Sequence, residues 1–140
     1  MTKSDYDQIQ ELMAIYAYSI DMRDYTKLAS CFTADATTVY AGHSDVLRGR
    51  DAIIAHMKRV LDSLDATQHL FTNFVMDIQG DSAKMTCDIL AQHVRQGARY
   101  LAGGKYQVEA SRAGGKWRIG NVSAGSVWSD GDRTMLPKAG

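Results

Sequence analysis

Asp21 and His69 are the pair of residues in this sequence whose types could together move a proton. Asp21 closes an apolar-periodic stretch, LMAIYAYSID, and His69 opens an alternating stretch, QHLFTNFVMDI. A carboxylate that holds an imidazole in one tautomer turns that imidazole into a general base. The two residues lie far apart in the chain, so the fold has to bring them together. If they meet in an apolar pocket, we expect a small enzyme that performs proton chemistry on an apolar substrate.

Other polar and aromatic residues are expected to line the same pocket. Buried polar groups need partners, and a few of them within an apolar face are typical of a small-molecule site. The candidates for chemistry besides the pair are Tyr16 and His93, and the candidates for substrate contact are Tyr40, Phe71, Asn73 and Asn121. Three residues are expected to have no catalytic role: Arg23 as a solvated charge, and His43 and His56 as structural or surface histidines.

The elements that must position these residues follow from hydrophobic periodicity. Apolar residues at three- and four-residue intervals predict helices over 4–22, 25–32 and 49–64. A Thr/Val-rich strand is expected over 36–40, and the period then changes to two for a meander of long strands with turns at 80–81 and 114–115. Helices grouped before strands predict an α+β domain, whose strongly bent sheet would wrap around the first helices.

Parity predicts the register between the first two long strands. Both apolar stripes fall on odd numbers, so facing residues must sum to an even number. A three-residue connection, 80–82, places His69 opposite His93 and Asn73 opposite Ile89. A two-residue turn would put the two histidines on opposite faces of the sheet. We therefore expect the longer connection.

Composition argues against several classes of function. Lys+Arg and Asp+Glu number 16 each, so no basic field exists to attract nucleic acid. No apolar run approaches the ~20 residues that span a bilayer, and the first ten residues are not a signal peptide. A single cytoplasmic domain over 1–140, without a membrane partner, is expected. The four histidines show no metal-binding spacing, so no metal or cofactor is expected; Cys31 and Cys87 are expected to be buried free thiols.

The sequence resembles the SnoaL-like branch of the nuclear transport factor 2-like superfamily. The resemblance rests on the phrases YAYSIDMRDYTKLASCFTADATTVY, GRDAIIAHM, QHLFTNF, GDSAKMTC and GGKYQVEASRAGGKWRI, in the order typical of the family. It implies a cone-shaped, curved antiparallel sheet with three N-terminal helices that enclose a deep pocket. The same scaffold hosts enzymes of several classes and non-catalytic subunits, so the resemblance implies the fold more specifically than the function.

The resemblance also implies roles for single residues. Asp21 and His69 look like the Asp–His dyad of the bile-acid dehydratase and hexachlorocyclohexane dehydrochlorinase groups, and Tyr16 matches the tyrosine of the bile-acid enzymes. The His69/His93 pair looks like the two histidines of scytalone dehydratase, with Asn121 as a pocket amide. The bile-acid pattern calls for an aspartate near position 92, where this chain has Gln92.

These observations predict a cofactor-free lyase that dehydrates a small cyclic or aromatic-derived substrate. His69 would take the proton, and Tyr16 and His93 would donate hydrogen bonds, although His93 as a structural residue stays open. The alternatives are an isomerase with Asp21 as base and Tyr16 as oxyanion donor, or a non-catalytic binding or assembly subunit. A homodimer or homotrimer is expected, and the polar tail, 129–140, is either disordered or closes the pocket of a neighbouring copy.

Overall fold

The computed structural model describes residues 2–42 and 45–137, so His43, expected to be structural or surface, lies outside the described residues. The described chain forms helices, strands and one short 3-10 turn. In chain order these are α1 (Asp5–Met22), α2 (Tyr25–Ser30), β1 (Phe32–Val39), β2 (Leu47–Arg48), α3 (Arg50–Asp62), β3 (Ala66–Gln79), β4 (Ser82–Arg95), β5 (Ala98–Ala113), β6 (Lys116–Gly131) and η1 (Arg133–Met135).

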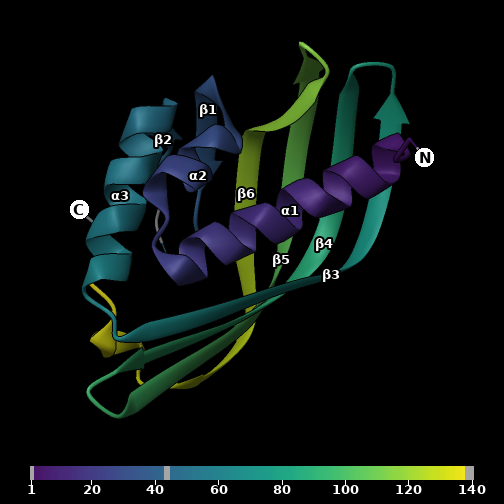
Figure 1. Ribbon diagram of the computed structural model, residues 1–140. Coiled ribbons are helices and arrows are strands. Elements are labelled where there is room, and N and C mark those ends of the chain that lie inside the picture. Colours follow the sequence, from purple (N-terminus) through teal and green to yellow (C-terminus); the bar gives the residue numbers. More distant parts are fainter. Residues whose placement is uncertain (1, 43–44, 138–140) are drawn as a thin grey trace.

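The strands form one sheet in the order β2-β1-β6-β5-β4-β3. β1 pairs with β6 in parallel, and the other neighbouring pairs are antiparallel. The sheet is strongly curved, α1 runs across its inner face, and α3 lies beyond the opposite edge from β3 (Figure 1). The predicted α+β fold, a curved antiparallel sheet with helices against it, is confirmed.

The first helix forms as its sequence predicts. The Ser4 hydroxyl accepts a hydrogen bond from the Asp7 backbone N–H at 3.1 Å and caps the helix N-terminus. The apolar stripe, from Ile9 to Ile20, is buried against the sheet. The helix ends where Arg23 adopts a left-handed conformation, with φ of 55°. Asp21 therefore lies in the last turn of the helix, directly after Ile20, the last residue of the buried stripe.

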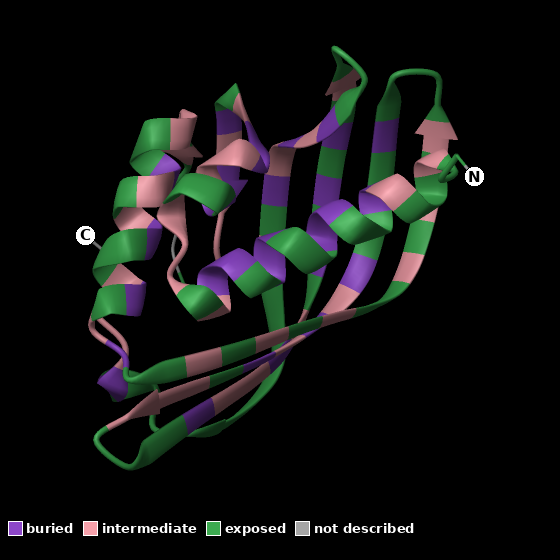
Figure 2. Cartoon of the chain, viewed as in Figure 1, coloured by how far each residue is buried: buried purple, intermediate pink, exposed green. Residues whose placement is uncertain are grey.

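Alternation of buried and exposed residues along β4 and β5 agrees with the predicted period of two. On β4 the odd-numbered residues from Ala83 to Ala91 are buried, and on β5 Tyr106, Val108 and Ala110 are buried. Figure 2 shows this alternation as bands along the strands beneath α1. The inner faces of these strands and the stripe of α1 make one continuous apolar core.

The predicted register between β3 and β4 is wrong. The hairpin has a two-residue turn, with Gln79 paired to Ser82, but an irregularity between Thr72 and Val75 adds one residue to β3. Because the bulge adds one residue, it reverses which residues of β3 point inward. Between Ala66 and Thr72 the numbers of paired residues therefore again have an even sum. His69 consequently faces Ala91 and lies diagonal to His93, rather than directly opposite it.

Asn73 is the bulged residue, and it lies on the outer surface rather than in a pocket. Its backbone has φ of 58°, and its side-chain amide donates to the Asp88 carboxylate at 2.6 Å. Beyond it Phe74 and Met76 pack against the core, whereas Val75, expected on the inner stripe, is 70% exposed. The expected substrate contact of Asn73 is therefore not supported.

A second bulge, at Gly120, has the same effect on β6. Ala110 pairs with Ile119 and Glu109 pairs with Asn121, so Gly120 is the extra residue. Asn121 is turned away from the inner stripe, and its amide donates to the Thr37 hydroxyl at 2.7 Å. The structure joins Asn121 to β1 and does not place it in a pocket.

The C-terminal segment is ordered as far as it is described. β6 continues to Gly131, and the short turn η1 then brings Met135 into a small cluster with Leu64 and Tyr100. Arg95 holds this segment by donating to the Met135 carbonyl oxygen at 3.0 Å. The part of the predicted tail up to Pro137 thus packs against its own chain.

Three further features of the described residues concern the cysteines, membrane helices and clusters of metal-binding side chains. Cys31 and Cys87 are buried free thiols, as predicted. Within ranges 2–42 and 45–137, no helix is long and apolar enough to cross a membrane. The same residues contain no group of three or more His, Cys, Asp or Glu side chains arranged to hold a metal ion.

The bulge predicts how β3 responds to substitution of Asn73. Asn73→Val should lower the free energy of unfolding by about 1–2 kcal/mol, because a β-branched residue is strained at positive φ. Asn73→Gly should cost less, since glycine adopts this conformation freely and loses only the bond to Asp88. Urea unfolding of both variants tests this. Equal losses in the two variants would contradict a backbone origin, and Thr72→Val, in the neighbouring exposed strand position, is the control.

Candidate active site

A cavity of about 380 Å³ lies between the helices and the curved sheet. Its apolar wall comes from α1 and α3 on one side and from small residues of the strands on the other. Its polar lining consists mainly of the side chains of Tyr40, His56, His69, His93, Tyr100, Tyr106, Ser126, Arg133 and Thr134. A mostly apolar cavity with a few converging polar groups is the usual form of a small-molecule site.

Asp21 and His69 meet at the wall of this cavity. His69 Nδ1 lies 2.8 Å from Asp21 Oδ1, and the His69 backbone N–H donates to Oδ2 at 2.9 Å. Because an ionised carboxylate can only accept, Nδ1 carries the imidazole proton in this contact. The lone pair of the neutral ring is then on Nε2. His69 lines the cavity, whereas Asp21 is not among its lining residues, so the carboxylate holds from behind an imidazole that faces the cavity.

The position of Asp21 at the helix C-terminus is unfavourable for an anion, and the structure shows what compensates. Partial burial would by itself raise the pKa of the carboxyl. Hydrogen bonds from the His69 ring and backbone, attraction to the imidazole, and a hydrogen bond from Thr67 outweigh that effect, so the pKa is lowered. Asp21 therefore stays ionised at neutral pH and holds His69 in a single tautomer.

Thr67 and Arg23 complete the support of the dyad. The Thr67 hydroxyl lies 3.0 Å from Asp21 Oδ1 and 2.8 Å from the Arg23 guanidinium. A guanidinium can only donate, so Arg23 occupies a lone pair of the hydroxyl and directs its proton to Asp21. Arg23 also donates to the carbonyl oxygens of Asp21, at 3.1 Å, and of Leu61, at 3.3 Å. The expectation that Arg23 is a solvated charge is wrong.

Sequence reasoning missed Thr67, although a signal was present. Residues two apart on a strand share a face, so Thr67 and His69 had to point the same way. Arg23 carried no comparable signal, because its left-handed backbone is what turns the side chain back over the helix end.

His93 lies beside His69, with the ring centroids 5.9 Å apart and the planes at 83°. Its Nδ1 lies 3.0 Å from the Tyr100 carbonyl oxygen, which only accepts, so Nδ1 is the protonated nitrogen. Burial lowers the pKa of His93, and electrostatic interactions with His69 and Arg133 lower it further, against the hydrogen bond to Tyr100 and the charge of Asp21, which raise it. At neutral pH the ring is uncharged, and its Nε2 is an acceptor.

Three tyrosine side chains lie next to one another at the inner end of the cavity. Tyr16 is fully buried, and its hydroxyl is 2.9 Å from that of Tyr40, which lines the cavity. Burial raises the pKa of Tyr16 well above its ordinary value and the pKa of Tyr40 to about 12. Burial also strongly raises the pKa of Tyr106. All three hydroxyls stay protonated, but Tyr40 and Tyr106, rather than Tyr16, form the cavity wall.

The remaining predicted contact, Phe71, supports the site from behind. Its ring packs edge-on against Tyr106, with centroids 5.0 Å apart, and lies 5.7 Å from the ring of Tyr16. Conversely, His56 lines the cavity and stacks on Tyr40 at 6.1 Å, so the expectation that it is merely structural or at the surface is incomplete. Its position at the edge of the α3 stripe was the signal for this.

Comparison with protein families agrees with the geometry. A model of the SnoaL-like domain matches residues 2–123. The chain belongs to the SnoaL-like domain family. No curated protein matches the sequence significantly.

Solved structures of other SnoaL-like or related proteins share the fold. A candidate scytalone dehydratase from Novosphingobium aromaticivorans superposes with a TM-score of 0.86, at 20% identity, over 96% of this chain and 91% of that one. A candidate aromatic ring hydroxylase from the same organism has a TM-score of 0.85, at 24% identity, over 94% and 95%. A hexachlorocyclohexane dehydrochlorinase, LinA type 2, has a TM-score of 0.82, at 21% identity, over 91% and 88%. This SnoaL-like chain thus shares its fold with these three proteins.

The support of the dyad predicts a shift in the pKa of Asp21. Thr67→Val removes the hydroxyl that donates to the carboxylate and should raise the Asp21 pKa, measured by NMR titration of the carboxyl carbon. It should also cost about 1–2 kcal/mol of stability, because Arg23 loses an acceptor. Thr67→Ser keeps the hydroxyl and serves as the matched control. An unchanged Asp21 pKa in the valine variant would refute the role of Thr67.

The lowered pKa of His93 predicts a pH dependence of stability. The unfolded chain has the ordinary histidine pKa of 6.5, so below that pH the unfolded state binds a proton that the folded state resists. The free energy of unfolding should therefore fall as the pH drops below 6.5, down to the folded pKa. His93→Asn keeps a donor to Tyr100 and cannot titrate, so its stability should depend less on pH. Urea unfolding between pH 5 and 8 measures the difference; parallel curves would exclude a depressed His93 pKa.

Proposed function

We propose that this protein is a cofactor-independent lyase that removes water from a hydroxylated cyclic or aromatic-derived substrate. The supporting observation is the 2.8 Å contact of Asp21 with His69 at the wall of a 380 Å³ cavity with mainly apolar walls. Such a base, oriented by a carboxylate and largely removed from water, is suited to taking a weakly acidic proton.

The proposed reaction begins at His69 Nε2, which takes a proton from the carbon next to the one that bears the hydroxyl. The electron pair of the C–H bond becomes the new C=C π bond, and the electron pair of the C–O bond leaves with the oxygen. Asp21 stabilises the imidazolium that forms. General-base catalysis of this kind contributes about 10²–10⁴-fold to a rate.

The leaving hydroxyl needs a proton to depart as water, and the tyrosines are poor sources. Burial raises the pKa of Tyr40 to about 12, so its hydroxyl is suited to donating a hydrogen bond rather than to transferring its proton. The His69 imidazolium is the stronger acid and returns the proton it has taken. One residue then serves as base and acid, which favours a substrate whose departing hydrogen and hydroxyl lie on the same side of the ring.

The other polar groups of the cavity orient the substrate in this proposal. Tyr40 and Tyr106 donate hydrogen bonds to an oxygen whose charge increases as the proton is removed. His93 acts as an acceptor for the substrate hydroxyl, because its Nδ1–H is engaged by Tyr100 and its pKa is lowered. Tyr16 positions Tyr40 through the 2.9 Å contact between their hydroxyls.

The isomerase alternative receives less support from the geometry. It needs Asp21 as the base, but this carboxylate accepts three hydrogen bonds, has a lowered pKa and does not line the cavity. Self-association as a homodimer or homotrimer stays a prediction. It is consistent with several large apolar side chains at the surface, namely Leu70, Val75, Val127 and Trp128.

Substrate screening with matched variants tests the proposal. Hydroxylated cyclic ketones and partly reduced naphthols are incubated with the protein, and loss of one water is followed by mass spectrometry. For any compound that reacts, His69→Ala and Asp21→Asn should each lower kcat/KM at least about 100-fold.

Asp35→Asn removes one carboxylate from an exposed position and is the control for Asp21→Asn. Circular dichroism checks that each variant folds. Full activity of a folded His69→Ala variant would overturn the proposal, and tight binding without turnover across the screen would favour the binding-subunit alternative.

A further inference from the structure

Arg133 brings a cation to a cavity that contains no carboxylate among its described lining residues. Its guanidinium donates to the Tyr100 hydroxyl at 3.1 Å and to the Ala41 carbonyl oxygen at 3.2 Å. It packs so closely on Gly42 that a Cβ there would collide with it. Arg133 therefore links the C-terminal segment to the loop after β1, at the mouth of the cavity.

The ion pairs of the described residues all join other side chains, so the charge of Arg133 has no anionic partner among them. The adjacent Asp132 carboxylate is engaged by the backbone N–H and hydroxyl of Thr134. A guanidinium has five N–H donors, and the contacts of Arg133 with neutral acceptors use two of them. The remaining donors are available to an anion in a fork geometry that fits a carboxylate.

Tyr100 supplies a second donor at the same place. It is 3% exposed and lines the cavity. Because Arg133 can only donate, the Tyr100 oxygen is the acceptor in their contact, and its own O–H proton has no acceptor among the described residues. A buried hydroxyl without an acceptor is costly unless a ligand provides one.

We propose that Arg133 and Tyr100 form a carboxylate-binding subsite, so that the substrates of this cavity are ring compounds that bear a carboxylate group. The carboxylate binds at the mouth, and the ring lies against the apolar walls near His69. This inference rests on the proposed function only in assuming that the cavity holds the substrate; it does not depend on the dyad chemistry.

Binding of matched acids and amides to the full chain tests the subsite. The probes are 2-naphthoate, 6-hydroxy-2-naphthoate and cyclohexanecarboxylate, each paired with its neutral amide, with Kd measured by calorimetry at fixed ionic strength. A charge-assisted contact predicts that at least one acid binds about 10- to 100-fold more tightly than its amide. If no acid in the set outbinds its amide, whether both bind equally or neither binds, the proposal is overturned.

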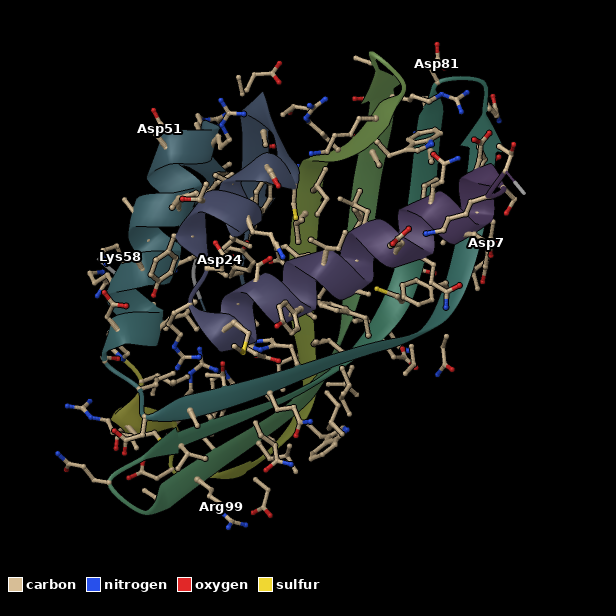
Figure 3. The ribbon with its side chains drawn as sticks, in the orientation of Figure 1. Asp7, Asp24, Asp51, Lys58, Asp81 and Arg99 are labelled. Atoms are coloured by element: carbon tan, nitrogen blue, oxygen red, sulfur yellow. The ribbon has the colours of Figure 1, made fainter. Side chains whose placement is uncertain are left out.

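Substitutions test whether Arg133 and Tyr100 cause the preference for the acid over the amide. Arg133→Gln should abolish the preference for the acid, Arg133→Lys should keep part of it as a point charge, and Tyr100→Phe should reduce it several-fold. Arg99→Gln removes an equal charge from an exposed position at the start of β5, where its side chain points outward (Figure 3), and should leave the preference intact. An acid preference that survives in a folded Arg133→Gln variant would refute the subsite.

The dyad variant separates this proposal from the proposed function. His69→Ala should lose turnover and keep the acid preference. Acid preference without turnover of any hydroxylated ring compound would leave the subsite standing and remove the lyase. Turnover of neutral substrates with no acid preference would support the lyase and overturn the subsite.

Discussion

The hydrogen bonds between Asp21 and His69 join the end of α1 to the first half of β3, and much of the site depends on this junction. A carboxylate in the last turn of a helix is repelled by the helix dipole. It is stable here because the backbone N–H and the ring of His69 and the hydroxyl of Thr67 all donate to it. The same bonds that satisfy a buried charge also orient the imidazole toward the cavity. The same hydrogen bonds thus hold α1 against β3 and position the imidazole of His69 at the cavity.

The surroundings of each titratable group in the site reinforce the state that its residue type favours at neutral pH. They lower the pKa of Asp21, which stays ionised, lower that of His93, which stays neutral, and raise those of the tyrosines, which stay protonated. Two neighbouring imidazoles, both with Nδ1 engaged, thus leave Nε2 as an acceptor. The cation of Arg133 lies at the mouth, where it lowers the pKa of His93, as His69 does, whereas Asp21 raises it. In the proposed function, a substrate would pass the positive charge of Arg133 and meet neutral polar groups inside.

β-Bulges decide which polar residues the cavity receives. Strict alternation along β3 and β6 would have turned Asn73 and Asn121 inward. One extra residue in each strand reverses the parity, so both amides face other partners, Asp88 and Thr37. The bulge in β3 also explains why His69 and His93 share a face although the hairpin turn has only two residues. The prediction that the two histidines share a face was right for a reason other than turn length, and the prediction that they lie directly opposite each other was wrong.

The fold class, the capped first helix, the long strands with their turns and the two residue types of the dyad could be predicted from the amino-acid sequence, whereas the contact between Asp21 and His69 depends on the fold. These predictions depend on local periodicity, on residue types at chain turns, and on a family pattern that spans most of the chain. The positions at which β3 and β6 exchange their inward and outward faces could not be predicted from the sequence. A bulge depends on the pairing with the neighbouring strand, and the residue pattern of one strand alone does not indicate it. The tertiary structure also decided the roles of Arg23 and Arg133. Arg23 follows a helix end in a left-handed conformation, and Arg133 lies in a C-terminal segment whose Met135 packs with Leu64 and Tyr100, which are distant in the sequence.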